Sequence, residues 1–188
     1  MKPIRRGKFW WLFPALAFVL VQAHECVYGG AGSAVQFDGI NGFIQVPNNQ
    51  NLNSFPFTVT AWIRSTNISS VAQGIVSKYA DSTFNGWSLV LQNGHLRGFY
   101  YTSTFNFPID ATASALTADG FWHQVAMTVD TGGGKLYVDG IQVGSGTWTG
   151  TPGAPTGAEP LEIGRYYTNS TCFGGTIAAT LSAAANPT

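Results

Sequence analysis

The stretch GWSLVLQNGHLRGFYY, from Gly86 to Tyr101, carries a strong hairpin signal at its centre. Asn93-Gly94 predicts a two-residue turn, because asparagine and glycine both tolerate the positive φ angles that this turn requires. Such a turn pairs Leu91 with Leu96. In that register the large apolar side chains share one face of the hairpin: Trp87, Leu89, Leu91, Leu96 and Tyr100. Turn chemistry and hydrophobic pattern therefore predict the same register, since a slip of one residue would turn this whole face to water.

The stretch FWHQVAMTVDTGGGKLYVDGIQV, over residues 121–143, has the same two features. Asp139-Gly140 predicts another two-residue turn, which pairs Leu136 with Val143. A four-residue loop over 131–134 would pair Asp130 with Lys135. The apolar side chains then share one face: Val125, Met127, Val129, Leu136, Val138, Ile141 and Val143. We interpret the stretch as scaffold, with its glycines serving turns.

The Trp122-His123 pair at the start of this stretch has two readings. A histidine beside a tryptophan could act as a base or a ligand, or it could be a half-buried residue bonded to the backbone. Beyond the leader, the other histidines are His24, near the start, and His95, in a hairpin. Because no catalytic arrangement is recognisable from their spacing, we favour the structural reading.

Alternation of apolar and polar residues recurs along the whole chain, as in FTVTAWIRS over residues 57–65. Further strands are expected over 34–37, 42–46, 74–78 and 161–164. Many short strands separated by turn signals are typical of an all-β protein. The sequence therefore predicts an antiparallel two-sheet β-sandwich of the jelly-roll type.

The first 23 residues have the order of a secretory signal peptide: basic residues, an apolar run over 9–21, and the small residue Ala23. An uncleaved signal anchor is the alternative. Without this leader the chain keeps five basic and nine acidic residues, a net charge of −4. We expect a secreted, extracellular or periplasmic domain that binds neither nucleic acid nor, after cleavage, membrane.

The two cysteines, Cys26 and Cys172, lie near opposite ends of the exported chain. Export to an oxidising compartment would allow a disulfide between them. Two unpaired thiols remain the alternative.

Seven motifs in order resemble the laminin-G-like (concanavalin A-like lectin/glucanase) jelly-roll domain family. They are AVQFDGINGFIQVP, FTVTAWIRS, GIVSKY, GWSLVLQNGHLRG, DGFWHQVAMTVD, KLYVDGIQVGSG and PLEIGRYY. After a lead-in over 24–33, the resemblance assigns a single domain to residues 34–181. It implies two curved antiparallel sheets and a secreted domain that binds carbohydrate or protein.

The end of the chain departs from the family pattern, because CFGGTI runs directly into AATLSAAANPT. A short last strand over 176–181 is one reading. The other is a sandwich that lacks its final strand, with residues 182–188 as a truncated tail. A missing strand would leave an unpaired sheet edge exposed.

By resemblance to the calcium-binding pentraxin branch of this fold, the loop after GIVSKY is a candidate calcium site. It offers Asp81 and Asn85, and the loop after LEIGR would add Asn169. Calcium prefers several oxygen ligands, usually including carboxylates. With one carboxylate the site would be weak, and ordinary loop capping is the alternative reading.

Aromatic residues in or beside predicted loops are the second candidate site. Tyr101, Trp148, Tyr166 and Tyr167 could stack on the apolar faces of sugars, while their polar atoms reach hydroxyls. The alternative is that these rings only cover the ends of the sandwich.

The function predicted from these features is a secreted, non-catalytic module that recognises a carbohydrate or a cell-surface or matrix protein. A glycoside hydrolase of the concanavalin A-like fold is the alternative, as is a purely structural adhesion domain. Hydrolysis needs a pair of carboxyl groups across the bond to be cleaved. Glu159 and Glu162 are three residues apart and would face opposite ways on a strand, which argues against catalysis.

Overall fold

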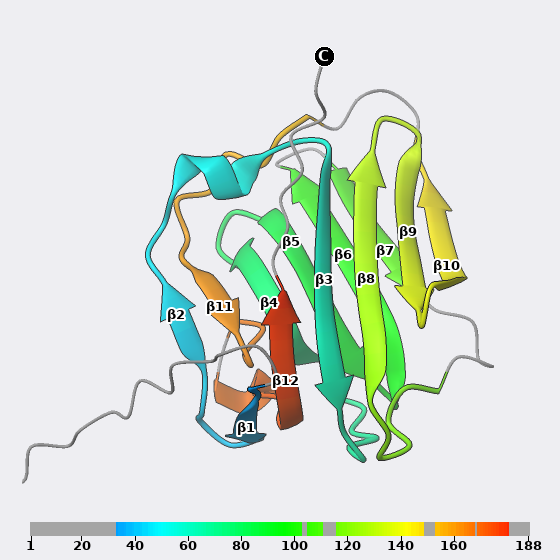
Figure 1. Cartoon of the computed structure of the whole chain (residues 1–188). Helices are drawn as coiled ribbons and strands as arrows, with labels where there is room; N and C mark the ends of the chain where they lie inside the picture. The colour runs from blue at the N-terminus through cyan, green and yellow to red at the C-terminus, as the bar shows by residue number, and fades with distance from the viewer. Residues whose placement is uncertain (1–32, 103–104, 111–115, 149–152, 168, 181–188) are drawn as a thin grey trace, which may run out of the picture.

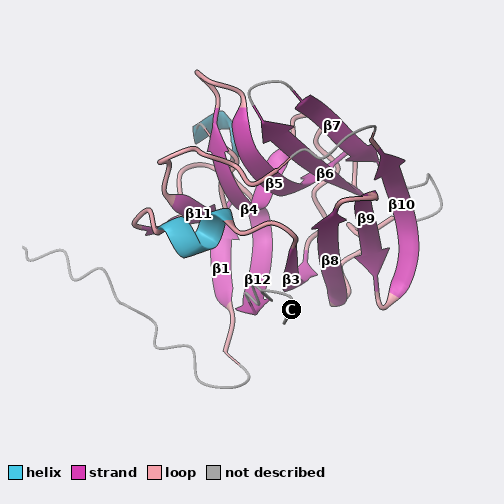
Figure 2. Ribbon diagram, turned by 90° about the horizontal axis from the view of Figure 1, so that it is seen from above, coloured by secondary structure: helices cyan, strands magenta, loops and turns pink. Residues whose placement is uncertain are grey.

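The computed structural model describes residues 33–102, 105–110, 116–148, 153–167 and 169–180. They form two six-stranded antiparallel sheets that face each other, which confirms the predicted sandwich (Figure 1). The first sheet has the strand order β1-β12-β3-β8-β9-β10, and the second has the order β2-β11-β4-β5-β6-β7. Seen from above, the sheets form two layers (Figure 2).

The strands of the first sheet are β1 (Val35–Asp38), β3 (Phe57–Arg64), β8 (His123–Asp130), β9 (Gly133–Val138), β10 (Ile141–Thr147) and β12 (Gly174–Thr180). Those of the second are β2 (Ile44–Val46), β4 (Gln73–Ala80), β5 (Asn85–Gln92), β6 (His95–Thr102), β7 (Phe105–Asp110) and β11 (Leu161–Ile163). Two short 3-10 helices, η1 (Gln50–Asn53) and η2 (Asn169–Thr171), lie in connections.

Both predicted two-residue turns are confirmed. In the β5–β6 hairpin Leu91 pairs with Leu96, and Asn93 has a φ angle of 53°. In the β9–β10 hairpin Val138 pairs with Ile141, and Asp139 has a φ angle of 52°. The local demand for positive φ therefore fixes the pairing next to each turn.

The predicted loop between β8 and β9 is too long by two residues at its C-terminal end. Asp130 pairs with Gly133, and Lys135 lies opposite Thr128, so the expected pair of Asp130 with Lys135 does not form. Gly133 is the first residue of β9. It has to be a glycine because a Cβ there would overlap the backbone carbonyl of Gly146 in β10. This glycine serves a close approach of strands, and not a turn.

A bulge in β10 between Gln142 and Gly144 overturns a second pairing, because it sets Gly144, and not Val143, opposite Leu136. The extra residue of a bulge shifts every pairing that follows it. Ile141, expected on the buried face, is 70% exposed at the edge of the sheet.

The last strand is present, which confirms the reading of a short final strand and overturns the alternative of a sandwich that lacks it. β12 lies between β1 and β3, with Ile177 opposite both Val35 and Ile63. Ile177 is buried there. Residues 181–188, including the predicted tail, lie outside the described residues.

The core lies between the sheets and is built from alternate residues of the strands. In β3 the burial pattern alternates along the whole strand, as the sequence predicts. The residues predicted for the core face of the hairpin, Trp87, Leu89, Leu91, Leu96 and Tyr100, are all buried. The sheets approach closely at Gly98, where a Cβ would lie 2.7 Å from the sulfur of Met127.

Among the described residues no helix is long and apolar enough to span a membrane. The predicted signal peptide and the lead-in, except for its last residue Ser33, precede the described part of the chain.

Candidate functional site

Five aromatic side chains gather on the outer face of the second sheet, away from the core. We call Tyr79, Phe99, Tyr101, Tyr166 and Tyr167 the tyrosine cluster. The ring centroids of Tyr79 and Tyr166 are 5.3 Å apart, and those of Tyr79 and Tyr101 are 5.0 Å apart. Phe99 is stacked on Tyr166 at 5.8 Å and 8°. Such contacts contribute beyond the area that they bury.

The cluster has a buried base and one exposed ring. Tyr79, Tyr101 and Tyr166 are 8–9% exposed, whereas Tyr167 is 41% exposed. The ring of Tyr167 stands at 89° to that of Tyr166, with 4.6 Å between centroids. A ligand can therefore reach the ring of Tyr167, while its neighbours hold that ring in place.

Small residues beneath the cluster bring Tyr166 onto the sheet. Ser77 of β4 donates a hydrogen bond of 2.7 Å from its hydroxyl to the backbone carbonyl of Tyr166. Ser88 of β5 lies opposite Ser77, with 3.1 Å between their hydroxyl oxygens. At Gly74 a Cβ would overlap the backbone of Arg165 and Tyr166. The segment after β11 thus lies directly against β4, which only small residues permit.

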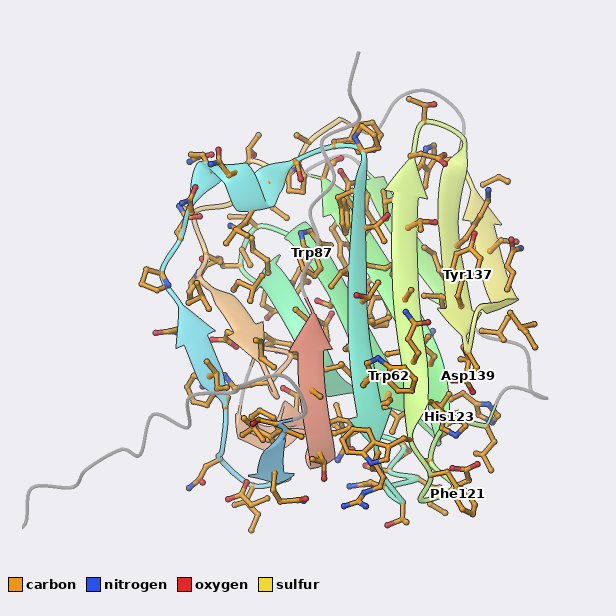
Figure 3. All side chains as sticks on the ribbon, in the orientation of Figure 1. Trp62, Trp87, Phe121, His123, Tyr137 and Asp139 are labelled. Atoms are coloured by element: carbon orange, nitrogen blue, oxygen red, sulfur yellow. The ribbon has the colours of Figure 1, made fainter. Side chains whose placement is uncertain are left out.

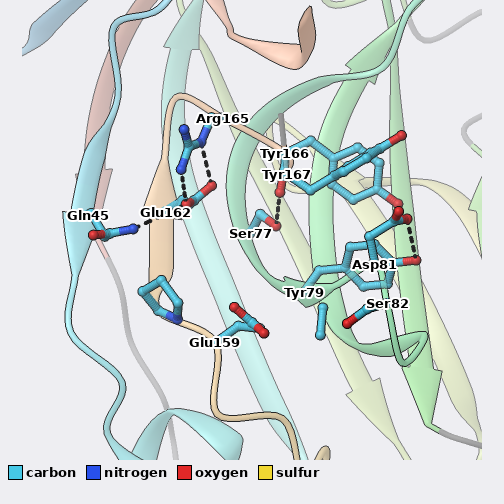
Figure 4. A pocket seen from close by; sticks show the side chains of 12 residues that line it. Gln45, Ser77, Tyr79, Asp81, Ser82, Glu159, Glu162, Arg165, Tyr166 and Tyr167 are labelled. Atoms are coloured by element: carbon cyan, nitrogen blue, oxygen red, sulfur yellow. Dashed lines mark hydrogen bonds and ion pairs between the residues drawn. The ribbon is translucent and has the colours of Figure 1, made fainter. Parts of the chain in front are cut away.

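A pocket of about 460 Å³ opens beside the cluster (Figure 4). Its polar wall has three carboxylates, Asp81, Glu159 and Glu162, and the guanidinium of Arg165. The other residues that line it are Gln45, Ser77, Tyr79, Ala80, Ser82, Pro160, Tyr166 and Tyr167. We call this cavity the tyrosine pocket. It combines an aromatic wall with convergent polar groups, as ligand sites commonly do.

Glu162 and Arg165 form a fixed ion pair in the wall of the pocket. Arg165 donates from Nε to one oxygen of Glu162 at 2.8 Å and from Nη2 to the other oxygen. Hydrogen bonding to Glu162 holds the pKa of Arg165 above its usual value, although burial opposes this. The guanidinium also lies 3.4 Å from the ring centroid of Phe43. Arg165 is therefore held in one orientation by the ring of Phe43 and by the two carboxylate oxygens of Glu162.

The segment that carries Glu159 is held by a buried lysine. Lys78 is 2% exposed, and its ammonium donates to the backbone carbonyls of Glu159 at 2.8 Å and Gly157 at 3.2 Å. A third bond of 2.9 Å goes to the side-chain oxygen of Asn48. Desolvation lowers the pKa of Lys78, while the charge of Glu159 opposes that shift.

The three buried phenols of the cluster, those of Tyr79, Tyr101 and Tyr166, stay protonated over the ordinary pH range. Burial raises the pKa of Tyr79, Tyr101 and Tyr166 above the usual value for tyrosine. The hydroxyl of Tyr79 donates to a carboxylate oxygen of Asp81 at 3.5 Å. The single O–H of Tyr79 is therefore already engaged within the wall of the pocket.

Three of the four predicted ligand-binding aromatics come together here, and the fourth does not. Tyr101, Tyr166 and Tyr167 belong to the cluster. Trp148 is only 8% exposed and stacks on Tyr100 in the core, with 5.7 Å between ring centroids. Its indole nitrogen donates to the carbonyl of Thr131 at 3.2 Å. The expectation that Trp148 is an exposed loop residue is therefore wrong.

The predicted calcium ligands fit a metal poorly. The side-chain oxygen of Asn85 accepts hydrogen bonds from the backbone nitrogens of Thr156, at 2.9 Å, and Gly157, at 3.0 Å. Asp81 lines the tyrosine pocket, but Asn85 does not. The side chain of Asn169 lies outside the described part of the structure. Within the described ranges no group of three or more histidine, cysteine or acidic residues is placed to hold a metal.

Two further predicted features have mixed outcomes. Cys172 is buried at 1% exposure, and Cys26 precedes the described residues, so the disulfide stays a prediction. His123 is not bonded to the backbone as expected. Its ring nitrogens lie 2.7 Å from a carboxylate oxygen of Asp139 and 3.0 Å from one of Asp119.

Sequence reasoning missed the acidic wall of the pocket. Glu159 and Glu162 line the same cavity, against the expectation that they face opposite ways. Strand alternation does not apply to this pair, because β11 begins only at Leu161. Tyr79 was also missed, because strand alternation marks it only as one more outward-facing residue of β4.

Residues 38–180 match the laminin-G-type family described as the concanavalin A-like lectin/glucanases superfamily. The chain belongs to this family. It matches no curated protein sequence.

Several solved structures share the fold at low sequence identity. Domains LG4-5 of the mouse laminin α1 chain superpose with a TM-score of 0.63 at 19% identity, over 87% of this chain and 47% of that one. The chain thus spans about half of that laminin structure. The sialidase CBM40 of Ruminococcus gnavus, bound to α2,3-sialyllactose, gives 0.58 at 13% identity, covering 81% and 94%. Domain 4 of the extracellular arabinanase AbnA from Geobacillus stearothermophilus, in complex with arabinotriose, gives 0.59 at 18%, covering 82% and 73%.

Proposed function

We propose that this protein is a secreted, non-catalytic module that binds a glycan in the tyrosine pocket. One observation carries the proposal: an exposed tyrosine ring, fixed on a buried aromatic base, forms one wall of a cavity whose other wall is polar. Sugar rings present apolar C–H faces beside hydroxyl groups, and such a cavity complements both. Sandwiches of the same fold in complex with sialyllactose and arabinotriose support this class of ligand.

The charge of the pocket favours a neutral glycan. Asp81, Glu159 and Glu162 stand against a single guanidinium, which already pairs with Glu162. Carboxylates accept hydrogen bonds from sugar hydroxyls but repel an acidic sugar. We therefore expect neutral oligosaccharides to bind here, in preference to sialylated or uronic ones.

The pocket also gives a reason to expect no hydrolysis. A glycosidase needs one carboxyl group as acid and a second as base or nucleophile. Both oxygens of Glu162 accept hydrogen bonds from Arg165, so this carboxylate is already engaged within the protein. Release of reducing sugar from a neutral polysaccharide would overturn the non-catalytic assignment.

Secretion rests on the predicted leader over residues 1–23. Expression of the full chain with export, followed by N-terminal sequencing, tests it. A mature protein that begins at residue 24 supports the proposal, and an intact leader favours the anchor alternative. Calcium remains a separate prediction, which binding assays with and without EDTA would test.

The ligand experiment is a glycan array followed by titration calorimetry with the best neutral oligosaccharide. Tyr167→Ala should weaken binding about tenfold, because 1.4 kcal/mol of lost stacking corresponds to that factor. Tyr167→Phe should retain most of the affinity, since it keeps the ring. Ile68→Ala is the matched control, because Ile68 is 67% exposed and does not line the pocket.

Three outcomes would contradict the proposal. One is an array on which no glycan binds. Another is equal affinity of wild type and Tyr167→Ala. The third is retention of an extracellular protein, and not a glycan, by the wild-type chain, which would support the matrix-protein alternative.

A further inference from the structure

A second cavity, of about 390 Å³, opens at the β1 side of the first sheet and shares no lining residue with the tyrosine pocket. Residues of β1, β3 and β12 line it. Three hydroxyls, one amide and three glycines make up most of the lining, and its aromatic residue, Phe37, is only 3% exposed. Arg64, the last residue of β3, supplies a guanidinium. We call this cavity the arginine pocket.

The register of β12 explains why the surface is hollow here. Thr176 lies between Gln36 of β1 and Arg64 of β3. Two residues earlier on the same strand, Gly174 lies opposite Asp38. Because Gly174 has no side chain, β12 leaves the space beside Asp38 open. With about 4.8 Å between strands and about 3.4 Å per residue, the Cα atoms of Arg64 and Asp38 are about 12 Å apart, so their side chains stand on two sides of the cavity.

Arg64 supplies hydrogen-bond donors on one side. Its guanidinium carbon lies 5.4 Å from the ring centroid of Trp122, at the distance of a cation–π contact. No carboxylate of the described residues pairs with it. Contact with the face of a ring uses none of the N–H donors of a guanidinium. Trp122 therefore holds Arg64 in place and leaves its donors for a ligand.

Asp38 supplies an acceptor on the other side. Its Oδ1 accepts three backbone N–H bonds at 2.8–3.1 Å in the turn that follows β1. These bonds, that of Ile40 first, hold the pKa of Asp38 below its usual value. Its second oxygen, Oδ2, makes no hydrogen bond to another residue of the described ranges. The turn thus fixes an ionised carboxylate that keeps one oxygen for a ligand hydroxyl.

An exposed aromatic ring stands next to the arginine pocket. Trp62 precedes Arg64 by two residues on β3, so both side chains point outward, about 7 Å apart along the strand. Trp62 is 47% exposed, and Figure 3 shows it on the sheet that is turned to the viewer. Its neighbour on β12 is Ala178, whose small side chain leaves the flank of the ring open. A polar cavity and an aromatic surface are therefore adjacent.

The charges around the arginine pocket favour a neutral ligand. Within the lining one carboxylate stands against one guanidinium. Beyond it, Asp119 and Asp139 add two carboxylates on either side of His123, so acids outnumber bases on this side of the molecule. These acids repel an acidic sugar, and Arg64 repels a cationic one. A neutral sugar meets no like charge, and its hydroxyls can both donate to Asp38 and accept from Arg64.

We propose that the arginine pocket and Trp62 form a second binding site, which takes two adjacent units of a neutral glycan. The hydroxyls of one unit would lie between Arg64 and Asp38, and the next unit would stack on the ring of Trp62. A peptide fits less well, because the polar lining offers no apolar recess for an anchoring side chain.

The proposal does not depend on the tyrosine pocket, which lies on the second sheet. Two sites on opposite sheets would let one molecule hold two glycan chains at once. Substitutions in each site therefore serve as controls for the other.

The test is affinity electrophoresis of the full chain carrying Tyr167→Ala, which weakens the tyrosine pocket, in gels that contain arabinan, galactan, xylan or β-glucan. At least one of these neutral polymers should retard the protein, and the acidic polymer polygalacturonate should not. Added to Tyr167→Ala, the changes Trp62→Ala, Arg64→Gln and Asp38→Asn should each raise the dissociation constant for that polymer about tenfold. Ile141→Ala is the matched control, because Ile141 is 70% exposed on the same sheet and does not line the cavity.

Asp38→Asn is the sharpest of these changes. The amide oxygen can still accept the three backbone bonds of the turn, while an NH₂ group, which only donates, replaces the free oxygen. Trp62→Phe should retain part of the affinity, because it keeps a ring. Far-UV circular dichroism and thermal melts would verify that each variant folds.

The proposal fails if no neutral polymer retards the Tyr167→Ala protein, or if polygalacturonate retards it more strongly than the neutral polymers do. It also fails if folded proteins that add Trp62→Ala or Arg64→Gln are retarded as strongly as their Tyr167→Ala parent. If Tyr167→Ala leaves the binding of wild type unchanged and Trp62→Ala removes it, this second site stands and the tyrosine pocket is refuted.

Discussion

His123 bridges two carboxylates, and this contact should make the stability of the domain depend on pH. Nδ1 lies 2.7 Å from Asp139 and Nε2 lies 3.0 Å from Asp119. Only the doubly protonated imidazolium can donate to both partners. Desolvation lowers the pKa of His123, but the hydrogen bonds that its ring donates to Asp139 and Asp119 outweigh it and raise the pKa above its ordinary value of 6.5.

The sign of the effect follows from that shift. A raised pKa in the folded state means that the folded protein binds the proton more tightly than the unfolded chain. The stabilisation is complete below the unfolded value, near 6.5, and disappears as the pH rises through the folded pKa. Asp119 remains ionised at mildly acidic pH, because a backbone hydrogen bond from Phe121 and the bond to His123 lower its pKa.

The magnitude is about 1 kcal/mol. A hydrogen bond to a charged group contributes about 1.5–3 kcal/mol, and solvent screening at a partly exposed pair reduces this. The side chains of Asp119 and Asp139 are 36% and 47% exposed, which places the bridge in the screened range. For a domain of this size the corresponding shift in melting temperature is about 3 °C.

The assay is urea unfolding of wild type and His123→Gln at pH 5.5 and pH 8.5. The advantage of wild type over the variant should be about 1 kcal/mol larger at pH 5.5 than at pH 8.5. In a background carrying Asp119→Asn and Asp139→Asn this difference should vanish. An advantage that does not change with pH, or a histidine that titrates below 6.5 by NMR, would refute the reasoning.

Three other predictions concern the packing around the tyrosine pocket. Lys78→Met should destabilise the domain by about 2 kcal/mol in urea unfolding, because it removes three hydrogen bonds from one buried ammonium group. A change below about 1 kcal/mol would contradict this result. Gly74→Ala should lower both the glycan affinity and the melting temperature, because its Cβ would overlap the backbone of Tyr166. If neither quantity falls, the segment that carries Tyr166 can move away from β4, and the reasoning is wrong. In a variant with Cys172 as the single cysteine, a thiol reagent should react only after denaturant is added. The reason is that burial both hides this thiol and raises its pKa. Rapid labelling of the native protein would contradict this prediction.

Local chemistry explains which parts of the fold could be predicted. The turns at Asn93-Gly94 and Asp139-Gly140 need only their own residues and the alternation on either side. The loop between β8 and β9 could not be placed the same way. In the sequence Gly133 looks like a turn glycine. A glycine is needed there because the backbone of Gly146, on the next strand, leaves no room for a side chain.

The site was less accessible from sequence because it is assembled from distant segments. Tyr166 and Tyr167 were identified as loop aromatics, but nothing in their neighbourhood indicates that Tyr79, about ninety residues earlier, supports them. The acidic wall was misjudged because Glu159 precedes its strand. Trp148 illustrates the opposite error, since a glycine-rich context suggested exposure where the ring fills space above Tyr100.

The position of β12 has a consequence for biosynthesis. β1 pairs with β12 alone in its sheet, and β12 also borders β3, so the two earliest strands of that sheet are joined only by the last one. Contacts between such distant segments form late and slowly. A nascent chain that emerges from a ribosome or translocon must therefore wait, with the edge of β3 bare, until residues 174–180 arrive. Chaperones that shield such an edge should matter more for this protein than for a sandwich whose neighbouring strands follow one another in order.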